Sequence, residues 1–402
     1  MAYLNGIFQY FYKENVEMDI TETRRNSRFV KGIVEEILKY VHGADERFSI
    51  TKECVGSFHS YTKVSEADEF DFSVVFDTGM KHQWLHLHQK PFYDLDSKLK
   101  KVIHSHNPLP RMLLKFPLLV NISVQKWKPQ GLNEEPNCVT IGDFIVPILV
   151  KRQFKTLVCA AVDHISKTRT LSYHGYQVIV QNLNESPAIT IIIRQLEGDD
   201  ISIDMAPLLK LQLPFKSEMR WQPDFGWPIP GAKWPSSEKV QQLFAVGINL
   251  VTTDLLYWKL SFATCERELL KDIDRDGTCR RKSLRIMKRL RELIWCPKEV
   301  TDGLTSYHLT NILFFECDRY PEEHQWRRRL LGKRILSMLG RLLEHIKEKH
   351  LPQYFNRQTN LFVKKSHQSL DKAGIYIKKF IDQPEKYLNN QLCNDDIEEC
   401  KD

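Results

Sequence analysis

The first clear pattern along the chain is a helical repeat of apolar side chains near the N-terminus. It predicts one long amphipathic helix over about residues 20–42, begun by a cap at Asp19 or Thr21. The apolar stripe consists of Phe29, Val30, Ile33, Val34, Ile37, Leu38 and Val41. The opposite side carries Arg24, Arg28, Lys31 and Lys39, with Glu35 among them. We therefore expect this helix to bury one face and to present a basic face to solvent.

After residue 50 the apolar residues no longer follow a helical spacing. Up to about residue 205 the chain consists mainly of runs rich in Val, Ile, Phe and Tyr, separated by turn residues, and such runs predict strands. They cover residues 69–77, 111–127, 170–183, 186–196 and 200–209. Residues 214–237 contain five prolines and three tryptophans, which predicts an irregular connection between two lobes.

Helical repeats return in the second half of the chain, over residues 277–297 and 324–352. The predicted fold is therefore α+β and bilobal, with a long N-terminal helix and a mixed β-sheet lobe followed by a helical lobe. The predicted division is residues 1–213 for the first lobe, 214–237 for the connection, 238–385 for the helical lobe and 386–402 for a flexible acidic tail.

Composition and charge narrow the class of protein. The chain has 402 residues, of which 42% are hydrophobic and 27% charged, as in globular proteins with a sizeable core. Nine cysteines are scattered without a CxxC pair, which favours reduced thiols in the cytosol or nucleus, and we expect a cytoplasmic protein. The N-terminal residues do not follow the pattern of a signal peptide, and no run of apolar residues approaches the length that crosses a membrane. We therefore expect neither a signal peptide nor a membrane span. The net charge of +7 weakly favours a polyanionic partner.

Two acids in one predicted strand, Glu69 and Asp71, form the first candidate site. Side chains two positions apart on a strand share a face, so both project together while Phe70 and Phe72 face a core. Adjacent carboxylates repel each other unless a cation lies between them, and Mg²⁺ suits oxygen ligands. Asp204 is the third candidate, because an acid in an apolar strand is costly to bury without a partner.

A Gly-Ser pair, Gly56 and Ser57, precedes the acidic strand and is expected to lie on the turn that leads into it. Glycine lets backbone N–H groups approach a phosphate, and the serine hydroxyl adds a donor. Each signal alone is weak, since an acidic pair on a strand is most often solvated surface. Together they match the needs of phosphoryl transfer with two metal ions.

The order of these motifs resembles that of template-independent nucleotidyltransferases. The pattern is closest to cyclic GMP–AMP synthase and the cGAS-like receptors, with the male-abnormal (Mab) family as relatives. Similar segments follow in the same order at residues 258–270 (WKLSFATCERELL), 283–288 (SLRIMK), 306–315 (SYHLTNILFF) and 353–362 (QYFNRQTNLF). The resemblance covers about residues 20–380.

The resemblance implies an enzyme of innate immune sensing that joins ATP and/or GTP into a cyclic dinucleotide. It assigns two Mg²⁺ ions, which Mn²⁺ can replace, to Glu69, Asp71 and Asp204. It assigns substrate contacts to Gly56, Ser57, Lys259, Glu266, Lys288, Ser306 and Tyr307. The aromatic ring of Tyr307 would stack on a base, and the alternative is a core tyrosine whose hydroxyl is satisfied.

The zinc thumb of the vertebrate synthase is missing, because residues 269–288 hold only Cys279 and no histidine. A structural zinc ion normally needs four N or S ligands, so we expect no zinc. Within the family this favours double-stranded RNA over DNA as the activating ligand, with a ligand-induced dimer as a further expectation. The predicted nucleic-acid contacts are the basic face of the first helix and a second cluster, Lys271, Arg275, Arg280, Arg281 and Lys282.

Two alternatives from other functional classes stay open. A Mab-type binding scaffold would keep the fold without catalysis, although scaffolds usually lose a metal carboxylate or the Gly-Ser turn. A polymerase of the oligoadenylate-synthase type would share the three acids and release linear products.

Overall fold

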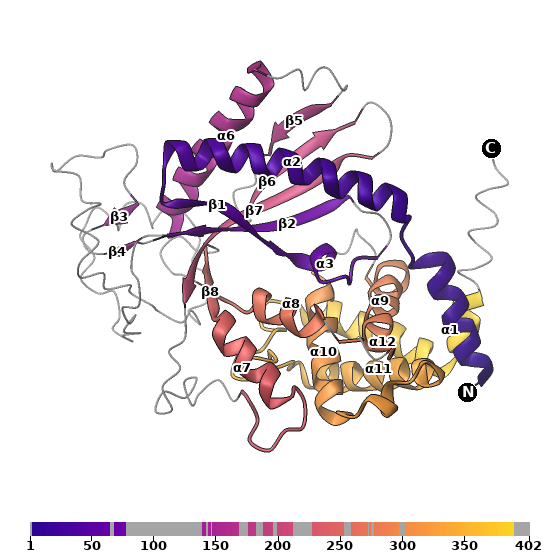
Figure 1. Cartoon of the computed structure of the whole chain (residues 1–402). Helices are drawn as coiled ribbons and strands as arrows, with labels where there is room; N and C mark the ends of the chain where they lie inside the picture. The colour runs from indigo at the N-terminus through magenta and orange to yellow at the C-terminus, as the bar shows by residue number, and fades with distance from the viewer. Residues whose placement is uncertain are drawn as a thin grey trace, which may run out of the picture.

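Two lobes make up the computed structural model, one built on a mixed β-sheet and one on helices (Figure 1). Each lobe has its own cluster of buried apolar side chains. The predicted α+β, bilobal architecture is therefore confirmed. The structure describes residues 2–64, 68–77, 139–141, 144–145, 147–168, 176–181, 188–195, 199–211, 227–252, 259–271, 273–274, 277–296 and 302–389.

The sheet lobe carries the long amphipathic helix α2, which spans Ile20–Ala44. Its cap is Asp19, whose carboxylate accepts a hydrogen bond from the Glu22 amide at 2.8 Å. The apolar stripe of α2 packs with helix α6 (Pro147–Thr168) against the sheet face that carries Phe70 and Phe72. The candidate acids Glu69 and Asp71 lie on the opposite face of the sheet, because they alternate with these phenylalanines along the strand.

Seven strands form the main sheet. They are β1 (Phe48–Val55), β2 (Glu69–Phe76), β5 (Gln177–Val180), β6 (Ile189–Arg194), β7 (Ile201–Leu211), β8 (Ile248–Val251) and β9 (Lys259–Ser261). The order is β1-β2-β7-β6-β5, and β8 pairs with both β7 and β9. Strands β2 and β7 run parallel, whereas the other pairs in this sheet are antiparallel. A separate pair, β3 (Thr140–Ile141) and β4 (Phe144–Ile145), is antiparallel.

Helices build the second lobe. They are α7 (Ser237–Val246), α8 (Ala263–Lys271), α9 (Arg280–Leu290), α10 (Ser306–Arg319), α11 (Leu331–Glu348) and α12 (His367–Asp382). The two helical repeats predicted from the sequence correspond to α9 and α11. Within the described residues, no helix is both long and apolar enough to cross a membrane.

The prediction that residues 50–205 are mainly strands is wrong for α6. Its buried side chains recur at helical spacing, at Val150, Phe154, Val158, Val162 and Ile165. They turn toward α2 and the sheet, so tertiary packing stabilises the helix. The predicted strand at residues 111–127 lies outside the described residues, as do residues 214–226 of the predicted connection.

The first helix, α1 (Ala2–Asn15), belongs to the helical lobe. Its buried side chains Leu4, Phe8 and Phe11 join the core of that lobe, although the sequence-based division assigns residues 1–213 to the sheet lobe. Leu388 is also fully buried in this core, inside the segment predicted as a flexible tail. The chain therefore starts in the helical lobe and crosses to the sheet lobe between α1 and α2 (Figure 1).

Replacing Phe8 with alanine tests the docking of α1. The ring is fully buried and lies 6.3 Å from the Phe380 ring, centroid to centroid, so Phe8→Ala should lower the free energy of unfolding by about 3–5 kcal/mol. Tyr3→Ala is the control on the same helix, because Tyr3 is 66% exposed and should change stability by less than about 0.5 kcal/mol. Chemical denaturation measures both, and equal effects would contradict the placement of α1.

Candidate active site

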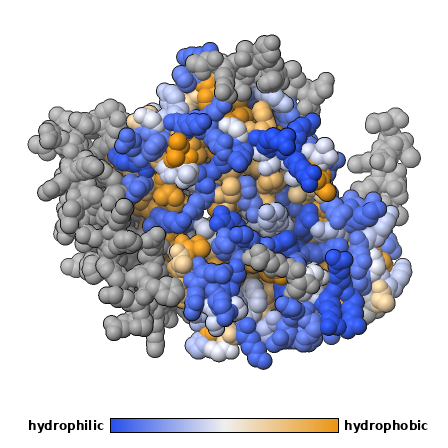
Figure 2. Space-filling model, in the orientation of Figure 1, coloured by the Kyte–Doolittle hydropathy of each residue, from blue (hydrophilic) through white to orange (hydrophobic). Residues whose placement is uncertain are grey.

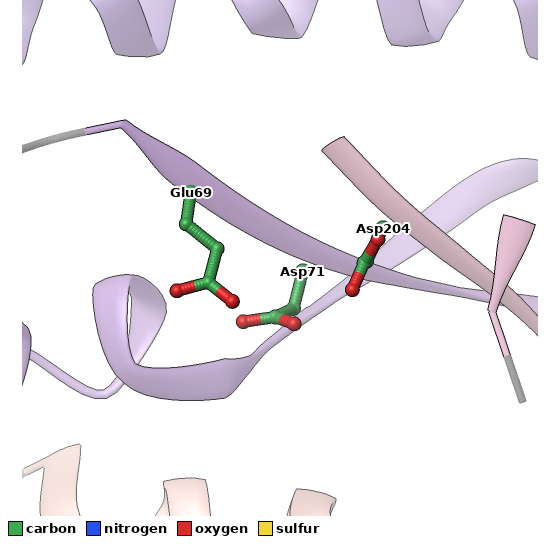
Figure 3. Close-up of side chains that lie close together, drawn as sticks. All are labelled: Glu69, Asp71 and Asp204. Atoms are coloured by element: carbon green, nitrogen blue, oxygen red, sulfur yellow. The ribbon is translucent and has the colours of Figure 1, made fainter. Parts of the chain in front are cut away.

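The side chains of Glu69, Asp71 and Asp204 point toward one another at the junction of β2 and β7 (Figure 3). One carboxylate oxygen from each residue lies within 4.8 Å of the others. Parallel pairing sets Asp71 directly opposite Asp204, and Glu69 shares the face of Asp71 two positions earlier. Such a group of possible metal ligands occurs once among the described residues.

The register of β2 is fixed from its other face. Phe70 and Phe72 are 1% and 3% exposed and pack in the core under α2 and α6. A shift of one residue would bury Glu69 and Asp71 and expose both rings, so the hydrophobic face determines where the acids point. This confirms the predicted orientation of the four side chains.

Gly56 lies against Asp71 and cannot carry a side chain there. Its φ is +77°, and a Cβ atom would come within 1.8 Å of Asp71 Oδ2. The strand pairing of Val55 with Asp71 brings the two residues together. Gly56 and Ser57 begin a one-turn helix, α3 (Gly56–His59), where the sequence predicted a turn.

The three carboxylates carry more negative charge than their surroundings compensate. Burial raises the pKa of Asp71 to about 7, with further contributions from Glu69 and Asp204. Burial also raises the pKa of Asp204, an effect that the hydroxyl of Thr190 opposes by donating a hydrogen bond at 2.6 Å. The site therefore favours either protonation or a bound cation.

Lys63 supplies one cation and was not singled out from the sequence. Its Nζ lies 3.0 Å from Glu69 Oε2 and 2.9 Å from Asp68 Oδ1. Burial alone would lower the pKa of Lys63, but the two carboxylates raise it more. The available signal was a single lysine just before the acidic segment that ends in Asp71.

These residues fit a site for divalent cations. Carboxylate oxygens are the ligands that Mg²⁺ and Mn²⁺ prefer, and three of them converge here from two rigid strands. The Lys63 ammonium contacts Glu69, whereas the pKa values of Asp71 and Asp204 are raised although the charges of Lys63 and Lys288 act to lower that of Asp71. A divalent ion bound here would therefore reduce the repulsion among the three carboxylates, which the neighbouring lysines balance only in part.

Lys288, a predicted substrate contact, is buried and already engaged. Its Nζ donates to the carbonyl of Thr62 at 3.2 Å and to the Thr62 hydroxyl at 2.7 Å. Burial lowers its pKa to about 7, and the nearby Arg291 contributes. In this structure Lys288 supports the segment between Ser57 and Glu69, a role that its motif did not indicate.

Tyr307 and Glu266, two further predicted substrate contacts, are bonded to each other. The Tyr307 hydroxyl donates to Glu266 at 2.7 Å and accepts from Gln353 at 2.7 Å. Burial raises the pKa of Glu266 to about 7. The hydroxyl is thus satisfied, as in the alternative reading of Tyr307, and Gln353 is a partner that sequence reasoning missed.

The remaining predicted substrate contacts are more accessible. Lys259 is exposed on β9, and Ser306 is half-buried at the start of α10. Ser57 is half-buried on α3, and its carbonyl accepts from the amides of Thr62 and Lys63 at 2.9 and 3.0 Å.

The four predicted basic residues on α2 are exposed, namely Arg24, Arg28, Lys31 and Lys39. The second basic cluster needs correction. Arg280 is 4% exposed and donates to the Ile273 carbonyl and the Thr278 hydroxyl. Arg281 donates to the carbonyls of Leu270 and Lys271 at the end of α8.

These two guanidinium groups are therefore occupied within the protein, because both donate to backbone carbonyls. Lys271 is exposed and Lys282 half-buried, and Arg275 lies outside the described residues.

Comparison with protein families defines the class. The Mab-21 protein nucleotidyltransferase domain matches residues 58–272, more than half of the chain. The Mab-21 protein HhH/H2TH-like domain matches residues 279–379. The chain therefore belongs to the Mab-21 family and has a nucleotidyltransferase fold followed by the helical domain of that family. The three acids fall inside the first match, and Gly56 and Ser57 lie just before it.

Two curated relatives bear the same name. Protein mab-21-like 3 of Danio rerio is 28% identical over 251 residues, which are 62% of this chain and 60% of the relative. Protein mab-21-like 3 of Xenopus laevis is 31% identical over 268 residues, 65% of this chain and 67% of the relative. The chain thus spans about three fifths of the length of the zebrafish protein.

Gly56→Ala should impair metal binding without unfolding the protein. The new Cβ would force the Asp71 carboxylate out of its position, and displacing a ligand in this way should weaken Mn²⁺ binding roughly 10–100-fold. Gly32→Ala on α2 is the matched control, because a Cβ there meets nothing within 4 Å. Calorimetric titration with Mn²⁺ measures both, and unchanged affinity in Gly56→Ala would show that Asp71 is not a ligand.

Asp71→Asn should stabilise the metal-free protein in a pH-dependent way. The folded protein holds the Asp71 proton up to pH about 7, whereas the ordinary pKa is 3.8. The wild type therefore loses stability relative to Asp71→Asn as the pH rises from about 4 to 7. Denaturation with chelator present should show a larger advantage at pH 8 than at pH 5. Asp163→Asn, an exposed control on α6, should show none.

Proposed function

We propose that this chain is a metal-dependent nucleotidyltransferase that joins ATP and/or GTP into a cyclic dinucleotide when double-stranded RNA binds it. The observation that carries the proposal is the convergence of Glu69, Asp71 and Asp204. Membership of a nucleotidyltransferase domain family supports the reaction class. The resemblance to the cGAS-like receptors supports a cyclic product and a role in innate immune sensing.

In this reaction Glu69, Asp71 and Asp204 would hold two Mg²⁺ or Mn²⁺ ions. When bound, the ions supply activation of the attacking hydroxyl and stabilisation of the leaving pyrophosphate. Asp71 and Asp204 sit on paired strands, so their relative position is set before substrate binds. The Thr190 hydroxyl orients Asp204 through its hydrogen bond. Lys63 must release Glu69, at least in part, for that carboxylate to coordinate an ion.

The substrates would lie between the acids and the helical lobe. Backbone amides near Gly56 and Ser57 would approach a phosphate, since no side chain intervenes at position 56. Tyr307 would offer its ring to a base, and its hydroxyl bonds to Glu266 and Gln353 would fix the ring orientation. Lys259 would meet phosphate, while Lys288 would act by holding Thr62.

A binding scaffold without catalysis is the second candidate. The observation that favours it is the Lys63 ammonium bonded to Glu69, which partly balances the site without a metal ion. A scaffold of this kind would bind nucleotide weakly or in the absence of metal, and it would form no phosphodiester bond.

A radiolabelled-nucleotide assay tests the proposal. Wild-type protein with ATP, GTP, Mg²⁺ or Mn²⁺ and an RNA duplex should form a phosphatase-resistant product, and double-stranded DNA should give less. The double variant Glu69→Ala, Asp71→Ala should lose at least about 100-fold in rate, because the metal ligands are removed. Glu344→Ala with Glu348→Ala, two exposed acids on α11, is the charge-matched control and should be fully active.

The nature of the product separates the candidates. A cyclic product has no free ends, so it resists phosphatase but is cleaved by phosphodiesterase. A ladder of linear oligomers would instead identify a polymerase. Absence of product under all these conditions, together with nucleotide binding that ignores metal, would favour the scaffold.

A further inference from the structure

The ammonium group of Lys63 is shared between two carboxylates that differ in kind. Its Nζ lies 2.9 Å from Asp68 Oδ1 and 3.0 Å from Glu69 Oε2. Among the described residues, the group of possible metal ligands includes Glu69 but not Asp68. A divalent ion that binds Glu69 therefore competes with this ammonium, because two cations at one carboxylate repel each other.

The backbone of Lys63 is fixed on both sides. Its amide donates to the Ser57 carbonyl at 3.0 Å, and its carbonyl accepts from Arg285 Nε at 3.0 Å. The next residue, Val64, is 4% exposed and packs in the core of the helical lobe. The side chain of Lys63 can exchange partners by rotating about its own torsions, and that rotation breaks none of these contacts.

Asp68 offers the ammonium a place to stay when Glu69 is taken by an ion. The Asp68 carbonyl accepts from the Ser202 amide at 2.7 Å, which holds Asp68 at the start of β2. The side chain of Lys63 is only 13% exposed, so an ammonium without a carboxylate partner would be costly there. The second ion pair lowers that cost, since it remains after Glu69 turns away.

Lys63 also lies beside the pair expected to contact phosphate. Its amide is bonded to Ser57, and its side chain reaches Glu69, so the residue connects the Gly-Ser pair with the metal ligands. Hydrophilic residues dominate much of the visible surface of the helical lobe, whose helix α9 holds this segment (Figure 2). A triphosphate bound between Ser57 and the acids would be within reach of a flexible, compact ammonium.

We propose that Lys63 is an exchangeable cation of the active site. It pairs with Glu69 while no divalent ion is bound. When an ion takes Glu69, Lys63 stays with Asp68 and turns its remaining hydrogen-bond donors to the phosphates of the nucleotide. The inference rests on the proposed function, because it places metal ions and a nucleoside triphosphate at the same acids.

Calorimetric titration with Mn²⁺, without nucleotide, tests the competition. Lys63→Met removes the charge at similar length and should bind Mn²⁺ at least about fivefold more tightly, as for other coupled binding events. The matched control is Lys52→Met, because the Lys52 side chain is 11% exposed and its Nζ lies 3.0 Å from Glu35, an acid on α2. The control should keep the wild-type affinity, and an unchanged or weaker affinity in Lys63→Met would overturn the inference.

Asp68→Asn tests whether the two carboxylates share the ammonium. Without Asp68 the ammonium pairs with Glu69 alone, so Mn²⁺ should bind more weakly than in the wild type. In the Lys63→Met background the same substitution should have little effect, since no ammonium is left to compete. An equal loss of affinity in both backgrounds would show a general effect of charge and would contradict sharing.

Nucleotide affinity should change in the opposite direction to metal affinity. At saturating Mn²⁺, Lys63→Met should bind a non-hydrolysable ATP analogue roughly tenfold more weakly, because a charged hydrogen bond to phosphate is lost. General damage to the site would weaken both ligands, and thermal unfolding verifies that the variants are folded. Unchanged affinity for the analogue would rule out the contact with phosphate.

The inference and the proposed function can fail separately. Opposite changes in Mn²⁺ and analogue affinity, in a protein that forms no product, would uphold the role of Lys63 and count against the proposed reaction. Product formation by the wild type, with wild-type affinities in Lys63→Met, would overturn the inference alone.

Discussion

Repulsion among three carboxylates is the constraint around which the rest of the structure is organised. Asp71 and Asp204 are held side by side because β2 and β7 pair in parallel, and the buried phenylalanines on the other face of β2 prevent a slip in register. Folding energy from the apolar core under α2 and α6 thus maintains an arrangement that is unfavourable in itself. Such an arrangement is strained without a cation and becomes favourable with one.

The acidic cluster also depends on the helical lobe. Arg285 on α9 donates to the carbonyls of Lys63 and Val16 at 3.0 and 2.7 Å, and to the Tyr12 hydroxyl. Lys288, one turn further along α9, holds Thr62. The segment that carries Lys63 is therefore fixed by the same helix that anchors the crossing from α1 to α2. A movement of α9 relative to the sheet would therefore change the position of Lys63 and, through the ion pair, that of Glu69.

Periodicity was sufficient to predict α2, β2, β7 and the shared face of the acids, because these depend on spacing within single elements. It was insufficient wherever the outcome depends on a partner far along the chain. Helix α1 packs into a lobe whose other helices begin more than 200 residues later, and Lys288 is engaged by Thr62. The resemblance to a family identified which residues belong to the site, but it did not show that Lys63 and Gln353 complete the contacts of Glu69 and Tyr307.

The arginines show most clearly that sequence spacing alone does not reveal which side chains are engaged by distant partners. Arg280 and Arg281 are indistinguishable in sequence from Arg327 and Arg328, since each pair lies among other cations at the start of a helix. Arg280 is nevertheless buried over Trp326, and Arg281 donates to carbonyls at the end of α8, whereas Arg327 and Arg328 are exposed. Burying Arg280 costs desolvation, which the hydrogen bonds of its guanidinium group offset. Among the described residues, the side chains of Arg327 and Arg328 make no such hydrogen bonds, so their charge is available to a ligand. Accessibility, more than the number of cations, therefore determines where a polyanion can bind.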